Sequence, residues 1–439
     1  MPRRDVMVAI VRVKESIGTP VEKSVEPAMG NDIIPHDRYI SKDFMKLEWE
    51  RMWSKVWLIG CREEEIPEVG DYITTEIGEE SVLIVRGEDN VPRALYNVCN
   101  HRGNRVKFDS CGNARTLQCA YHFWEYDLTG KLVFVPDEED FQQGCPPEKL
   151  SMKPIRTETW GGFVWFNLNP DCEPLSEFLG VIPEHLDPYR LGNMAMTMDV
   201  TVEWDCNWKA SVDAFNEVYH VQGIHPELCY TIDDVDVQID LYERHNRYLV
   251  PFKTHSPRMG ELEEVPEGLA QELHAIGMNP DDFRGRVPEI RRAVQVYKRA
   301  NEAKLGYDYT RLNDDQLSDD YHYYIFPNIT MNVHAESMLF FRQRPHETDP
   351  DKMYFDVRMF QMVADGKQRP PLPDHEQCKH GERSLGLVLD QDSVNLPHVQ
   401  KGMHSESFQG LWIRDQERRI RHMHKTLMDY INGHYANDA

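Results

Sequence analysis

Residues 99–122 read CNHRGNRVKFDSCGNARTLQCAYH. Within this stretch, Cys99 is followed closely by His101, and Cys119 is followed closely by His122. Seventeen residues separate His101 from Cys119, so the two Cys–His pairs lie on different loops that can meet in space. Thiolate and imidazole groups are common metal ligands. The stretch therefore predicts one metal centre held by two loops, around which this part of the chain folds.

The types of ligand narrow the kind of metal centre. A Rieske [2Fe-2S] cluster binds one iron through two cysteines and the other iron through two histidines. Each loop would then supply one ligand to each iron, which accounts for the mixed Cys–His pairs. A zinc ion could use the same four residues, although zinc sites usually pair Cys with Cys and His with His along the chain. Four unrelated buried residues are a third interpretation.

The composition leaves room for two domains, since the chain has 439 residues, of which 40% are apolar and 28% charged. It contains no run of apolar residues as long as a membrane span needs. The apolar run near the basic start is interrupted by Arg12 and Lys14, so we expect no secretory signal. The nine scattered cysteines fit reduced thiols and metal ligands in the cytoplasm better than a disulfide framework.

The charge balance bears on possible partners. The net charge is -25, from 49 basic and 74 acidic residues, and such a surface repels nucleic acids and anionic membranes. Basic residues nevertheless gather around the two Cys–His loops. They are Arg102, Arg105, Lys107, Arg115 and Lys131. Two interpretations stay open for them: ordinary solvated charges, or a docking patch for an acidic electron donor.

The first half of the chain has the pattern of a small all-β domain. Short β-type runs fill residues 57–166, and Gly and Asp turns separate them. Apolar residues at helical spacing predict a helix over residues 42–57. The two Cys–His loops therefore belong to the β domain, which follows a helical segment.

The second half has a different pattern. A strand over 194–204 is followed by a helical stretch from about Trp208. Further β-type runs occupy 321–325, 329–333, 337–342 and 353–363. A closing amphipathic helix carries its apolar residues on one side: Leu411, Ile420, Met423, Leu427 and Ile431. The polar insertion at 256–320 predicts a functional loop or lid, or plain surface decoration.

A second candidate metal site lies in the helical stretch. His220 and His225 are five residues apart, which is imperfect for one face of a regular helix. A bulge or a helix end near Gly223 would bring them together. Taken alone, either histidine is more commonly a structural residue. Two histidines and one carboxylate, however, make the facial triad of non-haem Fe(II) oxygenases.

Several motifs resemble one family, the Rieske non-haem iron ring-hydroxylating oxygenases, in their α (terminal oxygenase) subunit. The sequences at 101–103 and 121–130 resemble the family's two cluster loops, with Phe123 where the family usually has Gly. The sequence of a carboxylate, two residues, His, four residues and His at 217–225 is similar to its iron-binding segment. The resemblance extends from about residue 40 to 430. It implies that Cys99, His101, Cys119 and His122 hold a [2Fe-2S] cluster.

The resemblance also implies the ligands of a mononuclear Fe²⁺, namely His220, His225 and a distant carboxylate. Residues 389–395, followed by Gln400 and Gly402, resemble the family's third-ligand segment and assign Asp392. Asp390 is the alternative, and both acids could instead belong to an exposed acidic turn.

Glu217 matches the family position that bridges the two metal centres. The resemblance implies that Glu217 accepts hydrogen bonds from a cluster histidine of the neighbouring subunit and from an iron-ligating histidine. Asp213 is expected to assist it, while Ala214 stands where many relatives have Asn. The plain alternative for Glu217 is an acid on the helix surface.

The fold class implied is α+β, an all-β Rieske [2Fe-2S] domain plus a helix-grip (START-like) catalytic domain with an antiparallel sheet. The expected divisions are an N-terminal segment (1–46) packing with the catalytic domain, the Rieske domain (47–166) and the catalytic domain (167–439). The family forms head-to-tail trimers, so we expect a homotrimer α3, or α3β3 with a small second subunit.

The reaction implied uses O2 and electrons from NAD(P)H, delivered by a reductase and often a ferredoxin. The expected activity is dihydroxylation or monohydroxylation of an apolar, aromatic small molecule at the iron. Oxidative N- or O-demethylation is the nearest alternative. An electron-transfer Rieske protein and a zinc-stabilised binding protein are alternatives from other classes.

Overall fold

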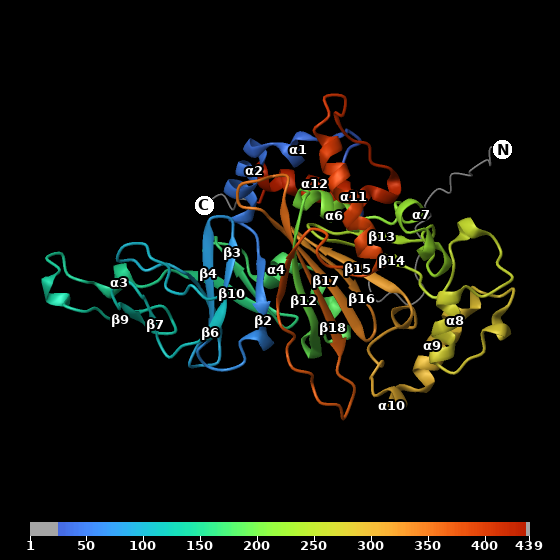
Figure 1. Cartoon of the computed structure of the whole chain (residues 1–439), viewed down its shortest axis with the longest axis horizontal. Coiled ribbons are helices and arrows are strands. Elements are labelled where there is room, and N and C mark those ends of the chain that lie inside the picture. The colour runs from blue at the N-terminus through green and yellow to red at the C-terminus, as the bar shows by residue number, and fades with distance from the viewer. Residues whose placement is uncertain (1–24, 436–439) are drawn as a thin grey trace.

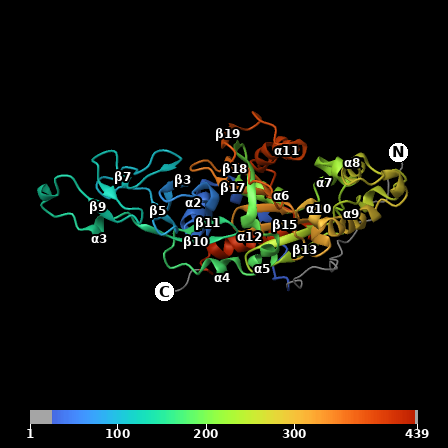
Figure 2. The ribbon, with the colours of Figure 1, turned by 90° about the horizontal axis from the view of Figure 1, so that it is seen from below.

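The computed structural model describes residues 25–435. Residues 1–24, which hold the start of the expected N-terminal segment and the stretch inspected for a secretory signal, lie outside the described residues, as do 436–439. A domain of strands forms one end of the molecule, and a larger mixed domain forms the rest (Figures 1 and 2). Within 25–435, no helix has both the length and the apolar character that crossing a membrane requires.

The smaller domain is built on a seven-stranded antiparallel sheet in the order β2-β11-β10-β5-β4-β3-β6. Its strands are β2 (Leu58–Arg62), β3 (Asp71–Ile77), β4 (Glu80–Arg86), β5 (Pro92–Tyr96), β6 (Cys111–Asn113), β10 (Pro154–Trp160) and β11 (Phe163–Asn167). A three-stranded sheet holds β7 (Leu117–Gln118), β8 (Glu125–Tyr126) and β9 (Leu132–Phe134). The helix α3 (Pro147–Leu150) follows β9. One Cys–His loop follows β5, and the other joins β7 to β8.

The two faces of β4 pack into two different cores, one of which is shared with the rest of the protein. Successive residues of a strand point to opposite faces of the sheet. Leu83 and Val85 pack into a core beneath the Cys–His loops. Val82 and Ile84 pack into the large core that continues into the other domain. Both faces of β4 are therefore buried, which explains its uninterrupted apolar sequence.

The larger domain contains an eight-stranded sheet in the order β13-β14-β15-β16-β17-β18-β12-β19. Its strands are β12 (Met194–Trp204), β13 (Gln238–Leu241), β14 (Asn246–Val250), β15 (Asp320–Ile325), β16 (Ile329–Val333), β17 (Ser337–Pro345), β18 (Met353–Met362) and β19 (Glu376–Lys379). The strands predicted at 194–204, 321–325, 329–333, 337–342 and 353–363 are confirmed. The edge strand β19 pairs with β12 in parallel. This pairing is an exception to the expected antiparallel sheet, and the sequence did not indicate it.

Three helices pack on and around this sheet. They are α6 (Trp208–Phe215), α11 (Leu387–Met403) and α12 (Arg418–Ile431). The helix α6 lies against β16 and β17, α12 lies against β13 and β14, and α11 contacts α6. Buried Ile420, Met423 and Leu427 confirm the apolar face of the closing helix. Leu411 does not belong to it, because the turn closed by the bond from the Arg414 N–H to the Glu417 carboxylate starts the helix later.

The described part of the N-terminal segment packs on the larger domain. The strand β1 (Ile34–Pro35) pairs with β20 (Gly410–Leu411). The helices α1 (Asp37–Ile40) and α2 (Lys42–Glu48) follow, and a π-helical turn continues α2 to Trp53, so the predicted helix ends a few residues early. The buried carboxylate of Glu48 lies 2.8 Å from the Lys209 ammonium, an ion pair that joins α2 to α6.

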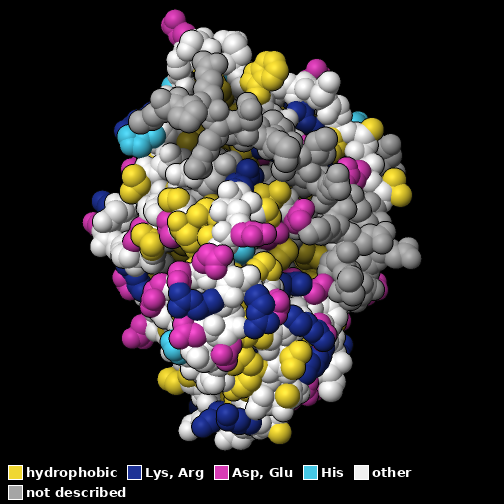
Figure 3. All heavy atoms as spheres, turned by 90° about the vertical axis from the view of Figure 1, so that its right-hand side faces the viewer, with side chains coloured by type: hydrophobic (Ala, Val, Ile, Leu, Met, Phe, Trp, Pro, Cys, Tyr) yellow, Lys and Arg dark blue, Asp and Glu magenta, His cyan; other side chains and the backbone are white. Residues whose placement is uncertain are grey.

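The insertion at 256–320 is a folded unit rather than a long irregular loop. It holds α8 (Glu267–Ala275), α9 (Glu289–Ala300) and α10 (Glu302–Leu305), and it lies at the end of the molecule opposite the small domain (Figure 1). Its helices enclose a small core of their own: Leu269, Leu273, Val287, Ile290 and Val294. Seen from this end, acidic and basic side chains are mixed over the surface (Figure 3).

Candidate metal centres

The two Cys–His loops have the same backbone structure. In the first loop the N–H of Gly103 donates to the carbonyl of Cys99 at 3.0 Å, and in the second the N–H of Phe123 donates to the carbonyl of Cys119 at 2.9 Å. A second bond closes each loop, from the N–H of the cysteine to the carbonyl five residues further on, at 2.8 and 2.9 Å. Each loop therefore holds its cysteine at the same place, whereas the histidine comes two residues after the cysteine in the first loop and three residues after it in the second.

This equivalence explains the unusual residue at position 123. Gly103 has a φ of +76°, and Phe123, at the corresponding position, has a φ of +59°. A left-handed backbone favours glycine and costs a residue with a Cβ on the order of 1 kcal/mol. The position thus requires a conformation that Gly adopts easily, and Phe123 adopts it while its ring remains 57% exposed. The local shape of the loop is retained.

The four candidate cluster ligands converge at the tips of the loops. The thiols of Cys99 and Cys119 are buried, and the rings of His101 and His122 lie 4.5 Å apart, centroid to centroid. The Tyr126 hydroxyl donates to the Cys99 sulfur at 3.2 Å. The buried Nδ1 of His101 makes no hydrogen bond with any described residue. A buried nitrogen without a hydrogen-bond partner, beside two thiols and a second imidazole, fits a metal cluster at this place.

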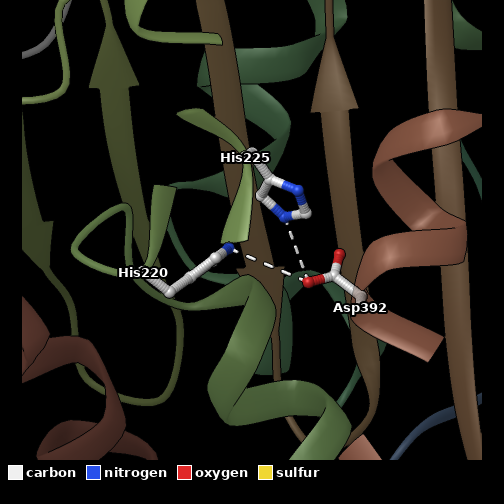
Figure 4. A group of neighbouring side chains, drawn as sticks. All are labelled: His220, His225 and Asp392. Carbon is white, nitrogen blue, oxygen red and sulfur yellow. Dashed lines mark hydrogen bonds and ion pairs between the residues drawn. The ribbon is translucent and has the colours of Figure 1, made fainter. Parts of the chain in front are cut away.

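The second centre forms where the chain leaves α6. A single helical turn, α7 (Val221–Ile224), separates His220 from His225, and it ends close to the position that the sequence predicts. Asp392 comes from α11. The Asp392 Oδ1 lies 3.1 Å from the Nε2 of His225 and 4.0 Å from the Nε2 of His220 (Figure 4). One ligand atom from each of these three residues lies within 4.8 Å of the others.

Neighbouring acceptors fix which nitrogen of each histidine faces this centre. The Nδ1 of His220 lies 2.6 Å from the Glu217 Oε1, and the Nδ1 of His225 lies 2.6 Å from the Gln391 Oε1. A carboxylate and an amide oxygen only accept, so both Nδ1 atoms donate. The Nε2 atoms of both rings therefore face the Asp392 carboxylate. The sequence analysis did not identify Gln391 as a partner of His225. The one feature of the sequence that points to it is its position directly before Asp392.

The Asp392 carboxylate and the two ring nitrogens that face it attract a cation, either a proton or a metal ion. Burial lowers the pKa of His220, but the Glu217 and Asp392 carboxylates outweigh burial and raise it above its ordinary value. The same negative potential favours a metal ion, which competes with protons for the nitrogen lone pairs. Two imidazoles and one carboxylate fit Fe²⁺.

The other acids predicted near this centre lie elsewhere. Asp390 accepts from the Ser384 hydroxyl at 2.5 Å and from the N–H of Leu385 at 2.8 Å, at the start of α11. It is Asp392, therefore, that lies beside the histidines. Asp213 accepts from the Tyr39 hydroxyl at 2.5 Å, and its carboxylate lies 3.6 Å from the His424 ring. These contacts place Asp213 among the groups that bind α6 to α1 and α12.

A cavity of about 290 Å³ reaches the second centre, a size close to the lower end for ligand pockets. Its walls come from α6, α7, α11 and the facing strands, and they are mainly apolar. The apolar side chains lining it include Phe215, Val218, Val250, Phe252, Leu339 and Phe341. His220, His225 and Asp392 lie in its wall, so a small apolar molecule in the cavity would lie beside them.

One of the basic residues near the cluster loops, Arg105, is paired with an acid. The Arg105 guanidinium makes two bonds to the Glu76 carboxylate, at 3.1 and 2.9 Å. The charged groups of Arg102 and Lys107 lie 5.1 Å from the ring centroids of Tyr121 and Tyr72. The contribution of Arg105 to a positive surface is therefore small, and the docking patch stays a prediction.

Comparison with known proteins agrees with this arrangement. Residues 56–147 match the family described as Rieske [2Fe-2S] domain, and residues 191–433 match the family described as ring hydroxylating alpha subunit (catalytic domain). The crystal structure of the quaternary ammonium Rieske monooxygenase CntA has the same fold. The TM-score is 0.66 at 18% identity, over 91% of this chain and 95% of that chain.

Two relatives show the range of the family. The glycine betaine monooxygenase oxygenase subunit of Pseudomonas aeruginosa (strain UCBPP-PA14) is 32% identical over 207 residues, 46% of this chain and 47% of that protein. The biphenyl dioxygenase subunit alpha of Paraburkholderia xenovorans (strain LB400) is 32% identical over 212 residues, 43% of this chain and 46% of that protein. The chain thus spans about half the length of the curated relatives that it matches.

The fold and the two matched domains define an alpha subunit of the Rieske type. The catalytic-domain match covers more than half of the chain, so the chain belongs to the ring-hydroxylating alpha subunits. The α+β fold class, with an all-β Rieske domain and a helix-grip catalytic domain, is confirmed. The expected cofactors are confirmed as well, namely a [2Fe-2S] cluster in the Rieske domain and a mononuclear iron in the catalytic domain.

Proposed function

We propose that the chain is the terminal oxygenase component of an O2-dependent enzyme that hydroxylates a small, mainly apolar, aromatic molecule. The arrangement of His220, His225 and Asp392 beside the apolar cavity is the observation that supports the proposal most strongly. In the proposal these three residues hold the iron, and Cys99, His101, Cys119 and His122 hold the cluster. Bound Fe²⁺ supplies O2 activation, and the cluster supplies electrons.

The protein residues around the iron site would orient the ligands and exclude water. Glu217 and Gln391 keep the Nδ1 protons of the two histidines in place, so that Nε2 is the donor atom in each ring. The apolar walls would hold the substrate beside the metal and keep bulk water out, which favours oxidation of the substrate over side reactions.

Oxidative N-demethylation is the second candidate. The relatives named glycine betaine monooxygenase favour it, because their name specifies a substrate whose nitrogen carries methyl groups. The electron-transfer and zinc-binding alternatives lack such support, since residues 191–433 match a catalytic domain. Hydroxylation of a ring and hydroxylation of an N-methyl group need the same iron site and differ in what the cavity binds.

The proposed partners follow from the distance between the two centres. In both ribbon views the β7–β9 end of the Rieske domain lies apart from α7 and α11 (Figures 1 and 2). We therefore propose a homotrimer α3, or α3β3 with a small second subunit, in which the cluster of one chain lies near the iron of the next. A reductase, with or without a ferredoxin, would deliver electrons from NAD(P)H.

The absence of disulfides among the nine cysteines suits the cytoplasm.

The cluster assignment is tested by Cys99→Ser and His122→Ala. Each variant removes one of the four ligands, and we expect the visible absorbance of the Rieske centre to disappear together with two iron atoms per chain. Cys111→Ser is the matched control, because Cys111 is exposed on the neighbouring strand β6, and this variant should keep full absorbance. A Cys99→Ser protein with an unchanged Rieske spectrum would contradict the assignment.

The proposed reaction is tested by product analysis. The purified chain, a compatible reductase and NADH are incubated under ¹⁸O2 with aromatic hydrocarbons and with N-methylated amines. We expect hydroxylated products with ¹⁸O incorporated, or formaldehyde and the demethylated amine if the second candidate is correct. Oxidation of NADH that yields only reduced oxygen species with every compound, in protein that contains full iron, would count against the oxygenase proposal.

A further inference from the structure

The apolar cavity also contains polar side chains that the iron site does not use. Asp320 begins β15, lines the cavity and is only 2% exposed. Tyr321 pairs with Val333 on β16, so the adjacent residues Asp320 and His334 lie side by side at the ends of the two strands. Asn332 and His334 also line the cavity.

The two oxygens of the Asp320 carboxylate differ in their surroundings. The Asn332 amide donates to Oδ2 at 2.7 Å, whereas Oδ1 is buried and makes no hydrogen bond with any described residue. Leaving a buried acceptor without a donor costs roughly 1–3 kcal/mol, so such atoms are rare in folded proteins. Oδ1 is therefore an acceptor in need of a donor, in the wall of a ligand cavity.

A second acceptor faces this oxygen. The Nδ1 of His334 lies 3.3 Å from the carbonyl oxygen of Asp319, which can only accept, so Nδ1 carries the proton. Burial lowers the pKa of His334 to about 4, so the ring is neutral and its Nε2 has a lone pair. That Nε2 lies 3.8 Å from the Asp320 Oδ1. Two acceptors thus face each other, and the described residues supply no donor to Oδ1.

The unpaired Oδ1 of Asp320 can obtain a hydrogen-bonding partner in two ways. Burial raises the pKa of Asp320 to about 7, so the empty cavity holds a mixture of the acid and the carboxylate. The acid could point its proton at the Nε2 of His334, but 3.8 Å is too long for a good hydrogen bond. A group from outside the chain that brings an N–H or O–H into the cavity satisfies Oδ1 directly.

We propose that Asp320 and His334 form a subsite that binds a hydrogen-bond donor of the substrate, a protonated amine or a hydroxyl group. The subsite rests on the proposed function, since it supplies polar recognition to the same cavity that the iron serves. The substrate class is then an apolar, ring-sized body that carries one N–H or O–H donor. An ammonium group with two N–H bonds can reach both acceptors, and its charge offsets that of the carboxylate.

A matched series of ligands tests the subsite by binding alone. Benzylamine, benzyl alcohol, toluene and benzyltrimethylammonium share one ring and differ in the donor and the charge. Isothermal titration calorimetry of the iron-loaded protein gives a dissociation constant for each without turnover. We expect benzylamine and benzyl alcohol to bind about tenfold or more tightly than toluene, the gain typical of a hydrogen bond to a charged acceptor. Benzylamine should lead the series.

Variants separate the subsite from the rest of the cavity. Asp320→Asn keeps the shape but loses the charge, and we expect the preference for benzylamine over toluene to fall at least fivefold. His334→Gln keeps an acceptor and a similar reach, so it should reduce that preference less. Leu339→Met is the control, because it changes an apolar wall of the cavity and should change the affinities for all four probes by a similar factor.

The proposal is overturned if toluene binds as tightly as benzylamine, or if benzylamine does not bind. It is also overturned if Asp320→Asn, folded by circular dichroism, keeps the full preference. Should that variant not fold, His334→Gln is measured in its place. An unchanged preference for benzylamine over toluene in that variant would then overturn the proposal. Tightest binding of benzyltrimethylammonium, which has no N–H or O–H, would also overturn the proposal, because the cavity would then recognise charge without a hydrogen-bond donor. Because these outcomes need no product, they are distinct from a failure of the oxygenase proposal.

Discussion

Replacement of His220, His225 or Asp392 by alanine is expected to remove the mononuclear iron and to leave the Rieske cluster in place. Each variant keeps only two of the three ligands, and two ligands do not form the facial site that Fe²⁺ requires. Iron should therefore fall by one atom per chain while the Rieske absorbance is unchanged. Turnover should fall below detection, since the electrons would have no site of O2 activation.

The control for this set is Asp390→Ala. Asp390 accepts bonds from Ser384 and Leu385 at the start of α11, so its loss should lower the free energy of unfolding by about 1 kcal/mol and leave the iron bound. Iron analysis, visible spectra and thermal unfolding check these outcomes. If Asp390→Ala lost the iron and Asp392→Ala kept it, the assignment of the third ligand would be wrong.

Glu217→Gln is expected to have the next largest effect, on electron transfer rather than on cofactor content. In the structure the Glu217 Oε1 accepts from the Nδ1 of His220 at 2.6 Å. The Glu217 Oε2 accepts from the backbone N–H of His220 at 3.0 Å. A glutamine has only one acceptor oxygen, so its NH2 group would face a donor at one of these places. We expect iron to remain, with its affinity weakened roughly tenfold to a hundredfold.

Stopped-flow mixing with O2 measures the electron-transfer step. Reduced protein with substrate should reoxidise its cluster quickly in the parent and at least tenfold more slowly in Glu217→Gln, because the proposed bridge between subunits is lost. Glu417→Gln is the control, since it removes a nearby charge that is close enough to raise the pKa of His220. Equal reoxidation rates in the parent and in Glu217→Gln would show that Glu217 takes no part in electron transfer from the cluster to the iron. A fully active monomer would remove the need for any bridge between subunits.

The sequence predicted the parts of these sites that are local. The Cys–His pairs and the spacing from Glu217 to His225 are each visible within one short segment. Asp392 lies 167 residues after His225, so it could be assigned only through the resemblance to a family. The resemblance transferred a ligand, but it did not indicate Gln391, which orients His225.

The remainder depends on tertiary structure. Asp320 begins β15 and His334 directly follows β16, and their facing acceptors appear once the two strands pair in register. The apolar pattern placed Leu411 in the closing helix, because a hydrophobic period carries no mark of where a helix starts. The bond from Arg414 to Glu417 sets that start, and Leu411 pairs with Ile34 on a strand.

The two cluster loops have one further consequence. Two backbone bonds close the second loop, and the side chain at position 123 is largely exposed to solvent. The small cost of its left-handed backbone is the same for most residues other than glycine. A substitution at this position therefore changes the exposed surface beside Cys119 and His122 while the backbone bonds that close the loop remain.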